Sequence, residues 1–424
     1  MTTLGGEENK PPLKELLFHK RYMLWSLSVQ CMRAPSIMTS LAFIIISYYA
    51  TGSYALGGLM VTVYTVGLIL FAVPGGRFVD KLGIAKGLPF LLLGSSLMFF
   101  LLLLATIFKA PSWILIVLAG FSSACLAGAA GGFRTLLSRV IPKRLIPSAV
   151  AIDATMIEVV VVTAPLVVSI IATFWESGAA IAMATASLVS AILAYSLARG
   201  TENNKAENES NVTESYAVPK SLWLNPRYIF WVLASVAFGH ALGTAETGAF
   251  PISKSLNGGP NTAAILIGIV SVFSIVSGLL YASLEKRIKL SKFLQANLML
   301  FVIVSGCFGL YASQSWPVVV ISLILIGTCT APLMILRSQA IEDEIPDDRK
   351  SEGFSVVGAA HSVGFGLSGI FLSILPLKGM LVSGAISGLV VILLAPILLS
   401  NKLYQKATAL PADSSNNSAS NTVK

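Results

Sequence analysis

Residues 75–86 read Gly75-Gly76-Arg77-Phe78-Val79-Asp80-Lys81-Leu82-Gly83-Ile84-Ala85-Lys86, and this stretch decides the fold. It separates two apolar runs, 55–73 and 88–108. At about 1.5 Å per helical residue, each run is long enough to cross a bilayer. We therefore expect residues 74–87 to form a tight hairpin loop at one membrane face, carrying one carboxylate and three cations.

The spacing Gly76-x-x-x-Asp80-Lys81-x-Gly83-x-x-Lys86 resembles the loop between helices 2 and 3 of major facilitator superfamily transporters. A weaker copy follows 205 residues later, where Glu285 and Lys286 replace Asp80 and Lys81 and both glycines are lost. The resemblance implies an all-α membrane protein with twelve transmembrane helices in two pseudo-symmetric six-helix halves. It also implies transport by alternating access.

Composition supports a protein with many membrane spans. Of the 424 residues, 55% are hydrophobic and 12% are charged, and the mean hydropathy is +0.80. A soluble protein has about 25% charged residues, so we do not expect a soluble enzyme. The net charge is +9, but the cations are distributed along the loops and form no basic stripe, so we do not expect a nucleic-acid partner either. The four cysteines all lie in apolar runs without metal-ligand spacing, and we expect no metal, disulfide, cofactor or signal peptide.

Apolar runs and their Gly, Pro and charge breaks predict twelve spans. They are 22–49, 55–73, 88–108, 113–137, 147–174, 178–197, 228–250, 263–280, 293–312, 317–336, 355–375 and 380–399. The predicted domains are an N-terminal six-helix bundle (1–198), a polar cytoplasmic linker (199–227), a C-terminal six-helix bundle (228–400) and a disordered cytoplasmic tail (401–424). Arg21-Tyr22-Met23-Leu24-Trp25 recurs as Arg227-Tyr228-Ile229-Phe230-Trp231, which supports a repeat.

The distribution of Lys and Arg predicts the orientation. With both termini cytoplasmic, 25 of the 29 Lys and Arg residues fall in inner segments and three in outer loops. Because cytoplasmic loops carry an excess of Lys and Arg, we expect a multi-pass protein of the cytoplasmic membrane.

Ionisable residues within the spans are candidates for the transport pathway, because a charge in the bilayer is costly and usually faces a cavity or a partner. Arg33 lies ~17 Å into the first span. One interpretation is a cation in the cavity that binds an anionic group or controls the proton of a carboxylate. The alternative is one half of a structural ion pair. Its expected partner is Glu158, at a similar depth in the fifth span. Asp153 is expected to meet a cytoplasmic cluster of Arg134, Arg139 and Asp80 instead.

The second half offers further candidates. His240 and Glu246 lie in the seventh span, the latter among small residues, and each is read either as a proton carrier or as a packed or capping residue. For His361 in the eleventh span the same two alternatives apply, and a packed histidine is the expected one. Thr328 and Thr330 in the tenth span are candidates for substrate contact, with helix packing as the alternative.

A second set is expected to form the inner gate. By resemblance, Gly76, Asp80, Lys81 and Gly83 hold one conformation of the gate, together with Arg134 and their second-half counterparts Glu285 and Arg337. The alternative is a solvated turn that only fixes topology. A carboxylate beside a helix N-terminus gains ~0.3–1 kcal/mol, which is enough to bias a two-state equilibrium.

Three functions remain open. The first is proton-coupled efflux of small amphipathic compounds or metabolites, the second proton-coupled uptake of a polar or anionic nutrient, and the third a non-transporting scaffold or sensor. The Arg and Gln that drug–proton antiporters often carry in the fourth span fall on Ala124 and Ala127 here. We expect a monomer with a small-molecule substrate, protons and the bilayer as partners.

Overall fold

The computed structural model describes residues 15–16, 18–199, 225–284, 287–312, 315–345 and 349–398. Residues 200–224 of the predicted linker, the predicted tail, and Glu285 with Lys286 lie outside these residues. The described part is helical and contains no strand. Its elements are α2 (Lys20–Thr51), α3 (Ala55–Leu82), α4 (Ile84–Ile107), α5 (Ser112–Ala127), α6 (Ala129–Val140), the 3-10 turn η1 (Lys143–Leu145), α7 (Ile146–Phe174), α8 (Ala179–Arg199), α9 (Pro226–Ser255), α10 (Pro260–Leu284), α11 (Lys292–Ala312), α12 (Trp316–Glu344), α13 (Lys350–Ile374) and α14 (Leu377–Leu398).

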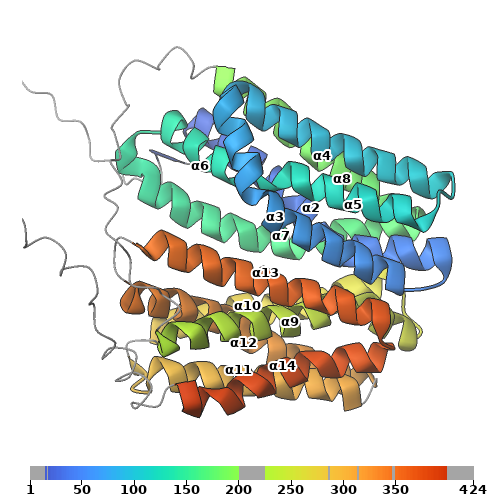
Figure 1. Cartoon of the computed structure of the whole chain (residues 1–424), viewed down its shortest axis with the longest axis vertical. Helices are drawn as coiled ribbons and strands as arrows, with labels where there is room; N and C mark the ends of the chain where they lie inside the picture. Colours follow the sequence, from blue (N-terminus) through green and yellow to red (C-terminus); the bar gives the residue numbers. More distant parts are fainter. Residues whose placement is uncertain are drawn as a thin grey trace, which may run out of the picture.

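The helices form two bundles that lie side by side (Figure 1). Helices α2–α8 pack together in one bundle and α9–α14 in the other, and the main contacts between bundles are α3 with α13 and α7 with α10. The expected all-α fold with two six-helix halves is confirmed.

Eleven segments of the described chain are long and apolar enough to cross a membrane. The remaining helix, α7, holds a shorter apolar segment, Val159–Phe174, within 29 helical residues. The fourth span comprises two helices, because the chain divides at Gly128 into α5 and α6. A Cβ at Gly128 would lie 2.2 Å from the carbonyl carbon of Gly75, so the backbones of α3 and the fourth span touch at the break.

The predicted hairpin loop after the second span is shorter than expected. Helix α3 continues past Pro74 to Leu82 and α4 starts at Ile84, so Gly83 alone separates them. Gly83 has φ +77°, a conformation that a side chain makes costly. An apolar run marks only the part of a helix that lies in lipid, whereas the helix itself continues for as long as its backbone hydrogen bonds do. The loop is therefore shorter than the gap between the two apolar runs.

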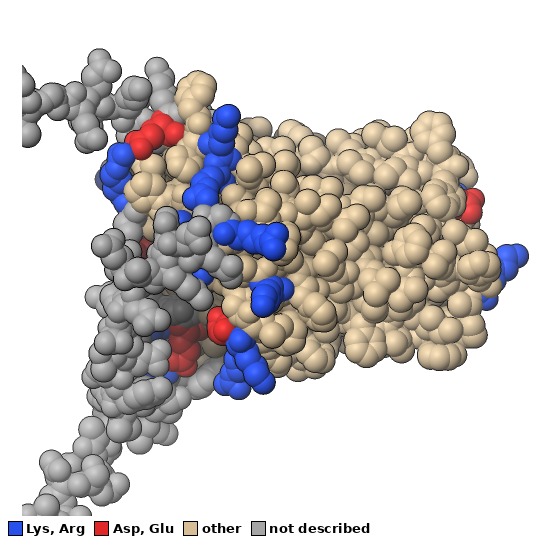
Figure 2. Space-filling view, turned by 90° about the horizontal axis from the view of Figure 1, so that it is seen from above, with Lys and Arg blue, Asp and Glu red and all other residues tan. Residues whose placement is uncertain are grey.

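Charged side chains gather at one end of the molecule (Figure 2). We call this the basic end; it contains the start of α2 at Lys20 and the turn at Gly83. The opposite end, here the far end, contains the turns at Gly52 and Asn257. Between them lies a broad surface without charge, as expected for a protein that spans a membrane.

Candidate functional site

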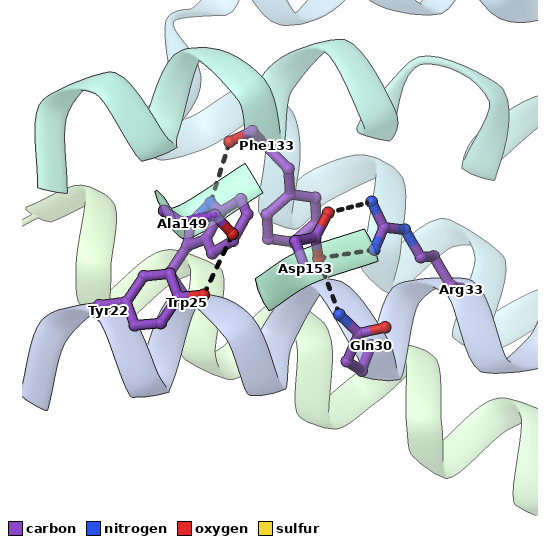
Figure 3. A network of polar contacts seen from close by, with 7 residues as sticks. All are labelled: Tyr22, Trp25, Gln30, Arg33, Phe133, Ala149 and Asp153. Atoms are coloured by element: carbon purple, nitrogen blue, oxygen red, sulfur yellow. Dashed lines mark hydrogen bonds and ion pairs between the residues drawn. The ribbon is translucent and has the colours of Figure 1, made fainter. Parts of the chain in front are cut away.

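A polar network lies inside the first bundle, between α2 and α7 (Figure 3). The Arg33 guanidinium donates from both Nη atoms to the two Asp153 carboxylate oxygens, at 2.7 and 2.8 Å. Gln30 Nε2 donates to the same carboxylate at 2.8 Å. The side chains of Arg33 and Asp153 are 28% and 15% exposed, so the pair is shielded but not sealed.

Two hydrogen bonds to the backbone hold α2 in register beside this network. The Tyr22 hydroxyl donates to Ala149 O on α7 at 3.2 Å, and Trp25 Nε1 donates to Phe133 O on α6 at 2.9 Å. Both rings are nearly fully buried. Because these anchors precede Gln30 and Arg33 on the same helix, they fix where both side chains meet α7 (Figure 3).

The described residues give Arg33 a partner that the prediction did not name. The prediction paired Arg33 with Glu158 by counting residues into each span, whereas the carboxylate that contacts Arg33 among the described side chains is that of Asp153. Side chains on a helix tilt toward its N-terminus, and the N-terminus of α2 lies at the basic end. The long Arg33 side chain therefore reaches back toward that end, where Asp153 lies. The side chain of Glu158 is outside the described residues.

The predicted cytoplasmic cluster is wrong. Arg134 and Arg139 on α6 and Asp80 on α3 are exposed, and Asp153 binds α2 instead. Asp80 makes no hydrogen bond or ion pair with any residue that the structure describes, and Lys81 beside it is exposed. In this conformation Asp80, Lys81 and Arg134 do not form a closed gate.

Arg337 belongs to a helix, not to a loop after the tenth span. It lies on α12, seven residues before the helix ends at Glu344. Its Nη1 is buried and has no hydrogen-bond partner in the described chain, and the same is true of His361 Nδ1. Arg337 on α12 and His361 on α13 therefore each carry a buried nitrogen without a partner among the described residues.

His240 is packed rather than free. Its ring stacks on Phe371 with centroids 5.2 Å apart, and its Nε2 is 3.1 Å from the Ser383 hydroxyl. The ring is 2% exposed, and Nδ1 has no partner among the described residues. This environment fits the packed-histidine alternative better than a proton carrier.

Glu246 lies where the two bundles meet. It is half-buried on α9, and its carboxyl group lies near the Ser40 side chain of α2. Thr328 and Thr330 on α12 each donate to their own helix, to Leu325 O at 2.9 Å and to Ile326 O at 2.8 Å. Their donors are therefore engaged, which favours the packing alternative for both threonines.

The two bundles close on each other toward the far end. Thr62 Oγ1 on α3 donates to Gly366 O on α13 at 3.0 Å, and a Cβ at Gly58 would lie 2.5 Å from Gly369 O. Asn261 Oδ1 on α10 accepts from Ser169 and Thr173 on α7, at 2.7 and 3.1 Å.

Aromatic side chains complete this closure. Phe250 packs against Tyr48, Tyr49 and Tyr54 with centroid separations of 5.5, 6.2 and 6.2 Å. The Lys254 ammonium lies 5.5 Å from the Tyr48 ring centroid, so a cation–π contact also joins the bundles.

The same helix faces separate toward the basic end. Gly76 lies 18 residues, or five turns, beyond Gly58 and thus on the same face of α3. Gly358 lies 11 residues, or about three turns, before Gly369 on α13. A Cβ at Gly76 or Gly358 would meet no atom of the described residues within 4 Å. Helices α3 and α13 therefore touch at the far end and diverge at the basic end.

These closure residues and Gln30 were not among the predicted site residues. Tyr48, Tyr49 and Tyr54 resemble the aromatic belt that membrane spans carry at their ends, so their pairing with Phe250 has no signal in the sequence. Gln30 does carry a signal, because it lies one helical turn before Arg33 and shares its face.

The described residues form two six-helix bundles that hold a shielded ion pair and touch each other at the far end. These features are those of a polytopic transporter. The chain belongs to the Major Facilitator Superfamily, whose family model matches residues 27–251 and 247–422. No curated protein sequence matches the chain.

Solved structures share this fold. A variant of the nucleoside transporter NupG superposes with a TM-score of 0.68 at 15% identity, covering 90% of this chain and 100% of that one. A bacterial homologue of the lysosomal transporter Spinster, described as inward-facing and unoccupied, gives 0.67 at 13% identity over 94% and 97%. A D-xylose–proton symporter gives 0.64 at 14% identity over 91% and 98%. At these identities the likeness concerns the fold.

Proposed function

We propose that this protein exports small amphipathic compounds from the cell by alternating access, driven by protons. The observation that carries alternating access is the contrast along α3 and α13: a Cβ at Gly58 would meet α13, whereas a Cβ at Gly76, on the same face, would meet no described atom within 4 Å. Rocking the bundles about the midpoint exchanges the closed and open ends. A substrate site between the two bundles is then reachable from only one side of the membrane in each state.

The basic end is proposed to face the cytoplasm. The Lys and Arg bias across the loops supports this orientation, since 25 of the 29 such residues lie in segments that the sequence predicts to be on that side. The conformation described above is then inward-open, with the far-end contacts forming the outer gate.

Asp153 is the proposed proton site. Its carboxylate accepts three hydrogen bonds, two of them from Arg33. Charge-assisted bonds of this kind are roughly twice as strong as neutral ones, so protonating the carboxylate weakens its hold on Arg33. Because Arg33 is 28% exposed, the released guanidinium can turn toward the space between the bundles. Binding of a proton thus changes the charge at the transport pathway.

Hydroxyl groups in the spans support an amphipathic substrate. Many of them donate to backbone carbonyls three or four residues back on their own helix. Examples are Thr39, Thr65, Ser235, Thr247, Thr328 and Thr330. A side chain bonded in this way offers no free donor, and a strongly polar substrate would leave its own groups unsatisfied. Amphipathic compounds cross bilayers unaided, so an energised carrier changes their distribution mainly by expelling them.

Transport in inverted vesicles tests the proposal. We expect an imposed outward proton gradient, with the vesicle lumen acidic, to drive accumulation of fluorescent amphipathic compounds, and a protonophore to abolish it. The variant Asp153→Asn should lose this accumulation. Accumulation that is indifferent to the gradient would exclude proton coupling.

A second candidate, proton-coupled uptake of an anionic nutrient, is favoured by Arg337. Its buried Nη1 has no partner in the described chain, and an unpaired buried donor is costly. An anionic group of a substrate would satisfy it. Uptake of organic anions by whole cells, abolished in Arg337→Gln but kept in Arg134→Gln, would support this candidate over export.

A further inference from the structure

A groove of about 370 Å³ runs between α4 and α8 on the outer surface of the first bundle. The helices are joined nearer the middle, where Ser96 Oγ donates to Ala184 O at 2.8 Å. Toward the basic end the residues between them are small: Ala85 and Pro89 on α4 and Ala191 on α8 form the floor.

The walls of the groove are large, apolar and exposed. Phe90 and Leu93 rise from α4, and Ile192 and Tyr195 from α8, with exposed fractions of 63, 47, 58 and 42%. Because both helices span the membrane, this surface faces acyl chains. A small-residue floor between large walls offers a chain more contact area than the flat surface around it.

Two cations lie at the mouth of the groove, at the basic end. Lys86 lines the groove from the first turn of α4. Arg199 is the last residue of α8, and its guanidinium lies 4.8 Å from the centroid of the Tyr195 ring, which lines the groove. Neither cation pairs with a carboxylate among the residues described. Their charges are therefore available to a ligand.

We propose that this groove is a binding site for an anionic phospholipid. One acyl chain lies on Ala85, Pro89 and Ala191 between the aromatic and aliphatic walls, and the phosphate group contacts Lys86 and Arg199. Basic pockets between spans are known to hold anionic head groups at the cytoplasmic leaflet. The groove matches the shape of an acyl chain, and the two cations match a negatively charged head group. A zwitterionic lipid fits the groove but has no net negative charge for the cations.

Native mass spectrometry of the full chain in detergent tests the site. The probes are phosphatidylglycerol and phosphatidylcholine with identical acyl chains. We expect phosphatidylglycerol to bind more tightly, and each of Lys86→Gln and Arg199→Gln to weaken it about fivefold, which corresponds to ~1 kcal/mol. The double variant should bind both lipids equally.

The matched control is the double variant Lys20→Gln/Arg139→Gln. It removes one Lys and one Arg that are exposed at the same end but lie outside the groove, and it should keep the preference for phosphatidylglycerol. Equal losses in the two double variants would show that general charge attracts the lipid, and would overturn the site. So would equal binding of the two lipids by the unaltered protein.

A shape variant separates the groove from its charges. Ala191→Phe fills the floor and should lower the binding of both lipids. If it does not fold, Phe90→Ala removes a wall and should weaken binding in the same way. Unchanged binding in a folded shape variant would overturn the groove as the place of the acyl chain.

Discussion

Arg33 and Asp153 illustrate what a single contact can contribute within a membrane span. The guanidinium and carboxylate meet through two parallel hydrogen bonds, and Gln30 adds a third. Removing one partner from a sealed pair costs ~3–5 kcal/mol. Because the Arg33–Asp153 pair is partly exposed, water can solvate the partner that remains. We therefore expect the loss of one partner to cost ~1–3 kcal/mol here. That is enough to change the population of a transport intermediate without unfolding the bundle.

We expect Asp153→Asn to reduce proton-driven transport at least tenfold, since ~1.4 kcal/mol corresponds to a factor of ten. The exchanged variant Arg33→Asp/Asp153→Arg should recover part of it. Initial transport rates in vesicles measure both. The control is Glu15→Gln, which breaks the exposed pair of Glu15 with Arg144, at 2.6 and 3.0 Å, and should leave the rate unchanged. Full activity of Asp153→Asn would contradict the assignment of the proton site.

Repeated residues do not have repeated roles. Trp25 and Trp231 occupy matching places at the starts of the two halves. Trp25 Nε1 donates to Phe133 O, whereas Trp231 Nε1 is buried without a partner in the described chain. Internal duplication therefore predicts the position of a side chain on its helix but not the atoms that it meets.

At the scale of elements, the turn between α3 and α4 depends on one residue. Gly83 has φ +77° and is the only residue between two long helices. A side chain in this region of backbone conformation costs roughly 1–2 kcal/mol.

We therefore expect Gly83→Ala to lower the thermal midpoint of the purified protein. Gly259→Ala serves as the control, because Gly259 also lies in a turn but has an ordinary φ and free space around it. Equal midpoints for the two variants would contradict a structural requirement for glycine at position 83.

The crossing of α3 and α13 sets which end of the molecule is closed. A Cβ at Gly58 would lie 2.5 Å from Gly369 O, so Gly58→Ala forces these helices apart at the far end. We expect this variant to favour the opposite conformation, with the far end open.

Spin labels placed on the turns at Gly52 and Asn257 would report this shift as a longer distance. Gly268→Ala on α10 is the matched control, since a Cβ there meets nothing within 4 Å. It should leave the distance distribution unchanged. An unaltered distribution in Gly58→Ala would show that the contact does not hold the closed state.

At the scale of the whole molecule, the orientation in the membrane follows from the arrangement of charge. Lys and Arg gather at the basic end (Figure 2), and the proposed mechanism requires that end to face the cytoplasm.

Labelling of whole cells with a membrane-impermeant maleimide checks this, in a chain whose native cysteines are replaced by serine. Ser53→Cys at the far end should react on intact cells, and Lys20→Cys at the basic end only after lysis. The reverse pattern would invert the direction of every step proposed above.

The sequence by itself determined the fold class, the membrane spans and the family, because apolar length, charge bias and the Gly76–Lys86 spacing are written locally along the chain. It also placed Arg33, Asp153 and Glu246 on their helices. Only the tertiary structure decided that Arg33 meets Asp153, that Phe250 packs against Tyr48 and that α3 touches α13 at the far end. Contacts of this kind depend on helix tilt, rotation and side-chain direction, which arise from packing between distant segments and are not encoded in the order of residues along a single span.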